Sequence, residues 1–531
     1  MSDEVQELWH EHTKIETRIT IDNAGGGSMH NFMGIDIGSY ESKGVIIDEN
    51  GDVLAIAVRP HGMDNPRPGY FEHDADGVWW KDFCSISKEL LERSGIRPSS
   101  VAAVGASTLG ADCVPVDENC RPLRKAILYG IDTRTSDELK FLNDYYGEEQ
   151  VLKMRGSPFG SEDAVAKILW IRNHEPEIFS RTHKFCTGST FITAKLTGEY
   201  VIDAFLAQTC FFPVYHGGKI RSDLIGEFFN PDKVANCRAT TDIVGKVTAE
   251  AAHQTGLAEG TPVTAGTDDA AAEAISAGIT DTGDMMVMLG SSMYLICITE
   301  REIRDERMWS SGYVIPDTFT LQGATNNAGT LTRWLGENIY RDFAAGPGRG
   351  KNSFELMMDD AGDIPPGSDG LVVLPYFAGE RSPIGDPLAK GVFFGLTLRH
   401  KRGHIYRACL ESIAYSLRQH LEIMESRGIR PDVLTAVGGG TKNPLWMQIL
   451  ADVSGKSIQT PAVNAGASYG DALIATIASG HNKNFSALKG IIRYETAYKP
   501  DMETNMKYEP YYDIFSRLYP ATRDIMRQMP R

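Results

Sequence analysis

Two strand–turn–strand patterns with a Gly-Ser tip, one in each half of the chain, constrain the fold more than any other feature of the sequence. The first, MGIDIGSYESKGVIIDENGDVL, runs from Met33 to Leu54, and the second, MMVMLGSSMYLICIT, runs from Met285 to Thr299. Apolar strand residues stand on both sides of each turn, at Gly38–Ser39 and at Gly290–Ser292. This repeat predicts two related α/β halves with a ligand held between their turns, although the two segments are too dissimilar to prove a duplication.

The remainder of the chain alternates strand-like and helix-like segments, which favours α/β layers. Helical patterns occur near Trp79–Ser94 and Glu162–His174, and a strand-like run occurs at Val101–Ser107. A chain of 531 residues exceeds what one hydrophobic core usually serves, so we expect two main domains. We predict a peripheral N-terminal extension over residues 1–28, domains over 29–262 and 263–510, and a helical C-terminal tail over 511–531.

The charge and cysteine content exclude several classes of function. The net charge of −17 and the pI near 5.3 argue against nucleic-acid or anionic-membrane partners, which require a basic surface. No apolar run reaches the length of a membrane span, and the polar N-terminus does not resemble a signal peptide. The cysteines form no CxxC pair or zinc-type cluster, so we expect reduced thiols and a cytoplasmic protein. They are Cys84, Cys113, Cys120, Cys186, Cys210, Cys237, Cys297 and Cys409.

The tip of the first hairpin carries residues suited to a metal-bound polyphosphate. Gly38 lets the backbone approach anionic oxygens with its N–H groups, and Lys43 adds a positive charge. Asp36 could hold Mg²⁺, directly or through water, because Mg²⁺ prefers hard oxygen ligands. An ordinary hairpin with a polar turn would have the same short pattern, so the signal is weak by itself.

Two further glycine-containing turns fit the same kind of ligand. The second hairpin places Gly290, Ser291 and Ser292 between two apolar strands. A strand-to-helix turn at Gly438–Gly440, followed by Asn443, could admit a flat ring or a phosphate close to the backbone. A lone run of glycines is often only a tight turn, and the order of all these segments along the chain is what gives them weight.

An adjacent pair of aspartates opens an Ala-rich helix in the segment AGTDDAAAEAISAG. A carboxylate at a helix start is a common N-cap, which explains one of Asp268 and Asp269. The other could then accept a proton from a substrate hydroxyl group. The chain contains no P-loop, no G-x-S-x-G and no kinase-type H-R-D motif, so these other enzyme classes are excluded.

Taken in this order, the four segments resemble the FGGY family of carbohydrate kinases, and within it the xylulose kinases. Three other stretches are similar to that family over a resemblance that covers residues 32–510. They are RPGYFEHDADGVWW (67–80), LRKAILYGIDTRT (123–135, with Tyr129 in the place of a Trp) and LPYFAGERSPIGDPLAKGVFFGLT (374–397).

The resemblance implies two ribonuclease-H/actin-like domains with a central cleft, the sugar on the N-terminal side and ATP on the C-terminal side. It implies that Asp269 is the catalytic base and that Asp36 supports Mg²⁺. The residues that it assigns to ATP and its phosphates are Gly38, Ser39, Tyr40, Lys43, Gly290, Ser291, Ser292, Gly438, Gly439, Gly440 and Asn443.

The sugar side departs from the xylulose kinases. Their Q-M-H-G stretch has no equivalent here, where Thr108, Leu109, Gly110, Ala111 and Asp112 stand instead. Asp132 matches the family's sugar-contacting acid, although one extra residue separates it from Tyr129. The predicted substrate contacts are Thr108, Leu109, Asp112, Asp132 and Asp269.

The resemblance implies an ATP- and Mg²⁺-dependent kinase for a hydroxyl of a small sugar, with a ketopentose such as xylulose as the preferred substrate. Ribulose, a tetritol, glycerol, another polyol or a signalling sugar stay open. A non-catalytic relative that binds nucleotide or sugar, and a chaperone-type ATPase, are the alternatives outside this class. Such a family also allows a homodimer, which nothing in the sequence decides.

Overall fold

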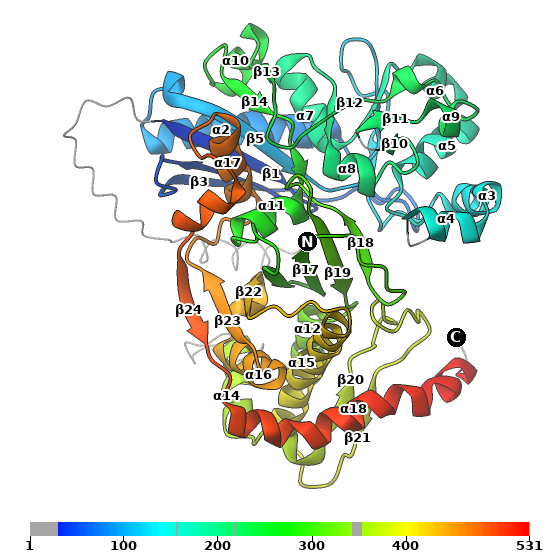
Figure 1. The fold of residues 1–531 in the computed structure, drawn as a ribbon, viewed down its shortest axis with the longest axis vertical. Coiled ribbons are helices and arrows are strands. Elements are labelled where there is room, and N and C mark those ends of the chain that lie inside the picture. The colour runs from blue at the N-terminus through cyan, green and yellow to red at the C-terminus, as the bar shows by residue number, and fades with distance from the viewer. Residues whose placement is uncertain (1–29, 156–157, 217, 342–352, 530–531) are drawn as a thin grey trace.

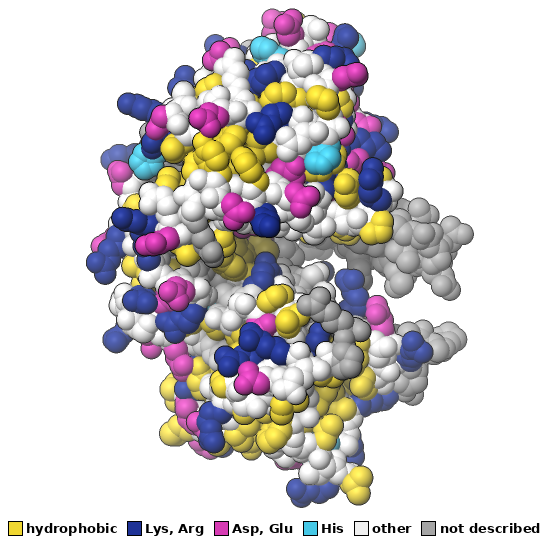
Figure 2. Space-filling view, turned by 90° about the vertical axis from the view of Figure 1, so that its right-hand side faces the viewer, with side chains coloured by type: hydrophobic (Ala, Val, Ile, Leu, Met, Phe, Trp, Pro, Cys, Tyr) yellow, Lys and Arg dark blue, Asp and Glu magenta, His cyan; other side chains and the backbone are white. Residues whose placement is uncertain are grey.

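The computed structural model describes residues 30–155, 158–216, 218–341 and 353–529. The predicted extension over 1–28 lies outside these residues. The described chain forms an upper and a lower α/β region (Figure 1), and the space-filling surface is hollowed between them (Figure 2). Within the described ranges no helix combines the length and apolar character needed to cross a bilayer.

The first sheet occupies the upper region and contains the first predicted hairpin. Its order is β13-β14-β5-β1-β2-β3, with β15 paired to β5. The hairpin strands are antiparallel and place Asp36 opposite Lys43, whereas β1 and β5 are parallel. The strands are β1 (Asn31–Ile37), β2 (Glu41–Ile47), β3 (Val53–Pro60), β5 (Val101–Thr108), β13 (Ile243–Lys246), β14 (Pro262–Thr264) and β15 (Thr267–Asp268).

The second sheet, in the lower region, contains the second predicted hairpin. Its order is β18-β19-β17-β16-β22-β23-β24. The strands are β16 (Met285–Leu289), β17 (Met293–Thr299), β18 (Trp309–Gly312), β19 (Phe319–Ala324), β22 (Val433–Val437), β23 (Ser457–Pro461) and β24 (Tyr494–Tyr498).

The two sheets repeat one pattern of pairing. Along β3-β2-β1-β5-β14 the pairs are antiparallel, antiparallel, parallel and parallel. The path β19-β17-β16-β22-β23 has the same succession. The prediction of two related halves, each built on a Gly-Ser hairpin, is therefore confirmed.

Helices cover both sheets, and local sequence explains where they begin and end. In α2 (Lys81–Ser94) the buried residues Phe83, Ile86 and Leu90 recur on one face, and Gly95 ends the helix in the left-handed conformation at φ 66°. The other long helices are α3 (Ser136–Tyr146), α5 (Ala164–His174), α7 (Gly188–Thr197), α11 (Asp269–Ser276), α12 (Gly329–Asn338), α14 (Ser353–Gly362), α15 (Arg402–Ser426), α16 (Pro444–Ser454), α17 (Ala467–Ala478) and α18 (Met502–Gln528).

Shorter elements complete the described chain. They are β4 (Glu72–His73), η1 (Ala75–Trp80), η2 (Pro98–Ser100), β6 (Val114–Val116), β7 (Ala126–Ile127), α4 (Glu148–Arg155), α6 (Pro176–Arg181), β8 (Lys184–Cys186), β9 (Val201–Asp203), α8 (Ala204–Thr209), β10 (Tyr215–His216), β11 (Lys219–Ile220), α9 (Ser222–Ile225), η3 (Pro231–Lys233), β12 (Asn236–Arg238), α10 (Ala249–Thr255), η4 (Ser368–Gly370), β20 (Val372–Leu374), β21 (Val392–Phe394), η5 (Gly439–Lys442) and η6 (Phe485–Gly490).

The predicted domain limits stay predictions, but the sheets show how the chain passes between the halves. Strands β14 and β15 lie beyond residue 262 and still belong to the first sheet. The predicted tail from residue 511 continues α18, which begins at Met502. The chain therefore leaves the first sheet only at Asp268, directly before α11.

Helix α17 comes from the second half of the chain but lies against the first sheet, beside α11 (Figure 1). Glycines make this approach close enough for backbone contact. A Cβ atom on Gly34 of β1 would lie 2.0 Å from the carbonyl oxygen of Ser468, and one on Gly470 would lie 1.8 Å from that of Ala272 in α11. No side chain fits at either position, so these residues fix where α11 and α17 cross.

We predict that Gly470→Ala destabilises the protein, although alanine is normally the better helix former. The added methyl group would collide with the backbone of α11, and overpacking of this kind lowers the free energy of unfolding by about 1–3 kcal/mol. Urea denaturation followed by circular dichroism measures the change. Gly490→Ala is the matched control, because a Cβ there meets no atom within 4 Å. Equal stability of the two variants would contradict the close crossing.

Candidate active site

The tip of the first hairpin is held by its neighbours while its backbone stays near the surface. The Gly38 N–H donates to Glu41 O at 2.9 Å, and the His61 N–H donates to Tyr40 O at 2.8 Å. The hydroxyl groups of Ser39 and Tyr129 lie 3.3 Å apart. Tyr40 is exposed, and Lys43 pairs loosely with Glu41 at 3.4 Å, so a polyphosphate could take the lysine from this carboxylate.

The tip of the second hairpin is supported by a segment that sequence reasoning missed. The N–H groups of Ala328 and Thr330 donate to Ser291 O at 2.9 and 3.0 Å, and that of Gly329 donates to Gly290 O at 3.0 Å. A Cβ on Gly329 would lie 2.5 Å from Gly290 O, so glycine is required at this contact. The start of α12 thus holds the tip of the second hairpin in place through these backbone hydrogen bonds.

The adjacent aspartates divide their roles as the sequence allowed. Asp268 caps α11, since its Oδ1 accepts the Ala271 N–H at 2.8 Å. Asp269 is the first residue of the helix and is left for chemistry. Burial raises the pKa of Asp269 to about 6. The pKa of Asp268 is also raised well above its usual range, mainly by burial and then by the charge of Asp269.

A cluster of carboxyl groups lies where the two halves meet, with Asp471 buried and Asp36 and Glu273 half-buried. Ser107 Oγ is 3.0 Å from Asp36 Oδ1 and 2.7 Å from Asp471 Oδ2, so one hydroxyl group of β5 bridges acids from β1 and α17. Burial is the main cause that raises the pKa of both acids well above their usual range. Burial also raises the pKa of Glu273 to about 7, while Lys43 opposes the shift.

The structure places Asp112 in a buried position with unused hydrogen-bonding capacity. Neither of its carboxylate oxygens has a partner among the described residues. Burial raises its pKa well above the usual range, Lys167 opposes the shift, and the charge of Asp269 reinforces it. Asp112 therefore lies in the electrostatic field of the candidate base. Of the other predicted contacts there, Thr108 and Leu109 are buried beside it, and Thr108 Oγ1 donates to Leu109 O at 3.3 Å.

Lys167 was also not predicted from the sequence as a residue of this site. It is fully buried in α5, where its Nζ donates to Ser161 O at 2.7 Å. Burial lowers its pKa, and nearby acids including Asp112 oppose that shift. The signal was available, because Lys167 is the one charged residue in the apolar run Ala164–Ile171. A buried lysine is costly unless an anion or a polar ligand compensates for it.

Asp132 is used differently from Asp112. It is buried, and Arg134 Nη2 donates to its Oδ2 at 2.8 Å, while the Phe71 N–H donates to the same oxygen at 2.7 Å. Its other oxygen accepts the Arg134 N–H at 3.0 Å. A substrate contact of Asp132 stays a prediction, and the structure gives its carboxylate a full set of protein partners.

The glycine-rich turn lies directly beside the second hairpin. Gly438 has φ 89°, and a Cβ there would lie 2.8 Å from Leu289 O; one on Gly440 would lie 2.7 Å from the Leu289 Cβ. A Cβ on Gly439 would meet no atom within 4 Å. Asn443 caps α16 by accepting the Trp446 N–H at 3.1 Å, and its Nδ2 donates to Tyr406 Oη at 3.1 Å. Gly439 is thus the open position of this turn.

The carboxylates suit a cation that is shared with phosphates rather than one enclosed by protein. In the described part of the chain no three His, Cys, Asp or Glu side chains group as metal ligands. Mg²⁺ needs no such group, since it commonly takes one or two carboxylates, substrate phosphates and water. The partly exposed Asp36 fits that role.

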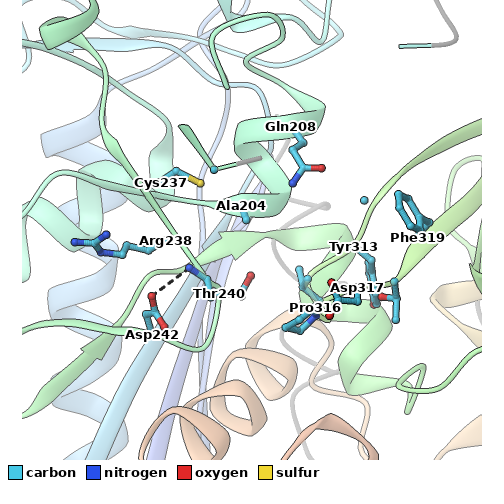
Figure 3. Close-up of a pocket in the computed structure, with 15 residues that line it drawn as sticks. Ala204, Gln208, Cys237, Arg238, Thr240, Asp242, Tyr313, Pro316, Asp317 and Phe319 are labelled. Atoms are coloured by element: carbon cyan, nitrogen blue, oxygen red, sulfur yellow. Dashed lines mark hydrogen bonds between the residues drawn. The ribbon is translucent and has the colours of Figure 1, made fainter. Parts of the chain in front are cut away.

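Two pockets lie near these elements. A pocket of about 510 Å³ between α8, β12 and the β18–β19 connection is lined by Gln208, Arg238 and Tyr313, and by none of the predicted site residues (Figure 3). A second pocket, of about 270 Å³, borders Glu273, Gly438 and Gly466. The second pocket joins the acid cluster to the glycine-rich turn.

Comparisons with known proteins agree with this geometry. Residues 31–276 match the N-terminal domain of the FGGY family of carbohydrate kinases, and residues 285–479 match its C-terminal domain. A xylulose kinase of Staphylococcus epidermidis is 29% identical over 93% of this chain and 97% of its own length. A gluconokinase of Bacillus subtilis is 26% identical over 92% and 95%. The crystal structure of xylulose kinase from Rhodospirillum rubrum superimposes with a TM-score of 0.83 at 29% identity, covering 94% of this chain and all of that one.

We predict that replacing Asp132 and Asp112 by asparagine changes the stability of the protein in different ways. Asp132→Asn should lower the free energy of unfolding by about 1.5–3 kcal/mol, because it removes the charge-assisted hydrogen bonds to the buried Arg134 guanidinium, which keeps only Glu72 as a counter-charge. Asp112→Asn should leave stability at pH 8 unchanged or higher, because burial already disfavours its charged form. Urea denaturation measures both. A loss of the same size in both variants would show that Asp112 is ionised and paired in the folded protein.

Proposed function

The chain belongs to the FGGY family of carbohydrate kinases, and we propose that it transfers the terminal phosphoryl group of MgATP to a hydroxyl group of a ketopentose such as xylulose. The observation that carries the proposal is Asp269, a half-buried carboxylate freed from capping by Asp268. It opens α11 directly after the last strand of the first sheet, where the two halves meet.

Asp269 acts as the general base in this proposal. Its carboxylate would accept a hydrogen bond from the substrate hydroxyl group, orient it toward the phosphorus atom and take its proton as the new P–O bond forms. A base with a pKa near 6 is mostly ionised at neutral pH. Phosphoryl transfer depends mainly on such positioning and on electrostatic stabilisation of the phosphate charge.

The two hairpins and the glycine-rich turn would hold the nucleotide. Backbone N–H groups near Gly38 and Gly290, together with Ser39, Ser292 and Lys43, would surround the phosphates, and the open Gly439 would face the nucleoside. Asp36 would hold Mg²⁺ through an oxygen ligand or through water. When bound, the ion would supply positive charge that offsets the negative charge of the phosphates.

The unpartnered Asp112 supports a neutral polyhydroxylated substrate. Its two buried carboxylate oxygens need hydrogen-bond donors, and neighbouring hydroxyl groups of a ketose can supply them. An aldonate such as gluconate would bring its own carboxylate near Asp269, which is mostly ionised at neutral pH. Among the substrates named by the relatives, this chemistry favours xylulose over gluconate.

We predict that a coupled ADP-release assay with MgATP detects turnover on a ketopentose and that Asp269→Asn reduces kcat by about 10²–10⁴-fold. The panel should contain xylulose, ribulose, aldoses, tetritols, glycerol, inositols and gluconate. Asp268→Asn is the matched control, because asparagine keeps the oxygen that caps α11. Wild-type kcat in Asp269→Asn would remove the base from the mechanism, and turnover of gluconate alone would overturn the substrate class.

We predict an acid limb in the pH profile of kcat/KM for the sugar. Burial raises the pKa of Asp269 to about 6, so the active, ionised form is lost as the pH falls through that value. Activity should drop about tenfold per pH unit below 6 and level off above about 7. Glu273, whose pKa burial raises to about 7, is tested by Glu273→Gln. A limb that moves with Glu273→Gln, or one centred near 4, would contradict the assignment.

A further inference from the structure

The segment Gly379–Asp386 is fixed at several points but presents one accessible charged side chain. Glu380 Oε1 accepts the N–H groups of Asn326 and Arg381 at 2.7 and 2.8 Å. The Ser382 N–H donates to Ala324 O at 3.0 Å, and Ser382 Oγ lies 2.7 Å from His420 Nε2. Glu380 and Ser382 are buried, whereas Arg381 between them is exposed.

Helix α18 holds the far end of this segment. Tyr519 Oη donates to Asp386 Oδ2 at 2.6 Å, and Arg527 Nη2 lies 3.1 Å from the same oxygen. The Glu380 N–H in turn donates to Asp386 O at 2.9 Å. The backbone on both sides of Arg381 is therefore anchored, and its guanidinium has a restricted space to occupy.

The Arg381 side chain reaches the support of the second hairpin. Its Nη2 donates to Thr325 O at 2.8 Å, and the Thr325 N–H donates to Met293 O at 2.9 Å. Met293 directly follows Ser292 at the hairpin tip. Two hydrogen bonds thus connect the guanidinium to the residue next to the predicted phosphate contact.

The same guanidinium is within electrostatic range of charges from the other half of the molecule. Although Arg381 is accessible to solvent, partial desolvation of its guanidinium lowers its pKa, and the charges of Glu380, Tyr294, Glu162 and Tyr129 oppose the shift. Glu162 and Tyr129 belong to the N-terminal half, and the Tyr129 hydroxyl group lies 3.3 Å from that of Ser39 on the first hairpin. Arg381 therefore contacts the support of the second hairpin and is within electrostatic range of Tyr129 beside the first.

A purely structural arginine would be expected to pair with a carboxylate, and Arg381 does not. Among the described residues its side chain makes one hydrogen bond, to a carbonyl oxygen, and no ion pair within 4.0 Å. Guanidinium has five N–H donors, so most of its capacity is unused. In Glu380, its nearest acid in sequence, Oε1 accepts hydrogen bonds from two backbone N–H groups.

We propose that Arg381 is a catalytic residue that donates hydrogen bonds to the phosphoryl group as it passes from the nucleotide to the substrate. The proposal rests on the kinase function proposed above, and it names a residue of the C-terminal half whose guanidinium is hydrogen-bonded to the support of the second hairpin. A planar guanidinium can contact two phosphoryl oxygens at once. Fixed donors aimed at oxygens that gain charge in the transition state lower the barrier without reorganisation.

The test compares Arg381→Gln and Arg381→Lys with Arg399→Gln, an exposed arginine of the same half. Arg381→Gln should lower kcat by about 10²–10³-fold. Arg381→Lys should have an intermediate effect, because lysine keeps the positive charge but lacks the planar pair of donors that contacts two oxygens at once. Calorimetric titration should show the affinity for a non-hydrolysable MgATP analogue reduced about tenfold and that for MgADP changed less than about twofold, since only the former carries the transferred group. Arg399→Gln should match the wild type in every measurement.

The titrations with nucleotide test the role of Arg381 independently of the proposed kinase function. A wild type that binds the triphosphate analogue but turns over no sugar would contradict the substrate assignment, and the titrations would still decide the role of Arg381. Wild-type kcat in Arg381→Gln, or equal losses for MgADP and the triphosphate analogue, would overturn the inference. A wild type that binds neither nucleotide would overturn both proposals. Thermal denaturation of each variant confirms that the protein is folded.

Discussion

The close crossing of α11 and α17 is the contact on which the arrangement of the two halves depends. Gly470 lets α17 touch the backbone of α11 at Ala272, and Gly34 lets the same helix touch β1. Because α17 belongs to the second half and lies on the first sheet, the halves share one hydrophobic cluster that includes Phe32 and Tyr469. Asp269, the first residue of α11, is consequently held in place by both halves.

The same crossing concentrates negative charge. Asp36, Asp471 and Glu273 come from three different elements, and tight packing removes all three carboxyl groups partly or wholly from solvent near Asp269. Burial raises their pKa values, so protons are retained there until a cation arrives. A nucleotide that enters with Mg²⁺ brings positive charge that would favour loss of these protons, whereas free ATP brings only negative charge and would favour their retention. The packing of the halves thus makes the metal requirement of the proposed reaction a property of the fold.

Local patterns predicted the parts of the site that depend on neighbouring residues. Alternating apolar residues around Gly38 and Gly290 predicted both hairpins, and the adjacent acids at Asp268 predicted one cap and one free carboxylate. Lys167 and Arg381 were not predicted as site residues. Their surroundings depend on which elements, distant in sequence, pack beside them. Asp132 shows the converse: its spacing matched a substrate contact, but Arg134, two residues away, occupies its carboxylate.

The two hairpins are alike in sequence but differ in their support, and this difference bears on how a reaction between the halves is coordinated. Backbone N–H groups of Ala328–Thr330 clamp the second hairpin, so its position follows from the fold alone. The first hairpin instead touches Tyr129 through the hydroxyl of Ser39. Burial raises the pKa of Tyr129, and the charges of Asp269 and Asp112 add to the shift. In the proposed mechanism a substrate beside Asp112 would therefore share its surroundings with the first hairpin, and Tyr129 would link the position of the sugar to that of the phosphates.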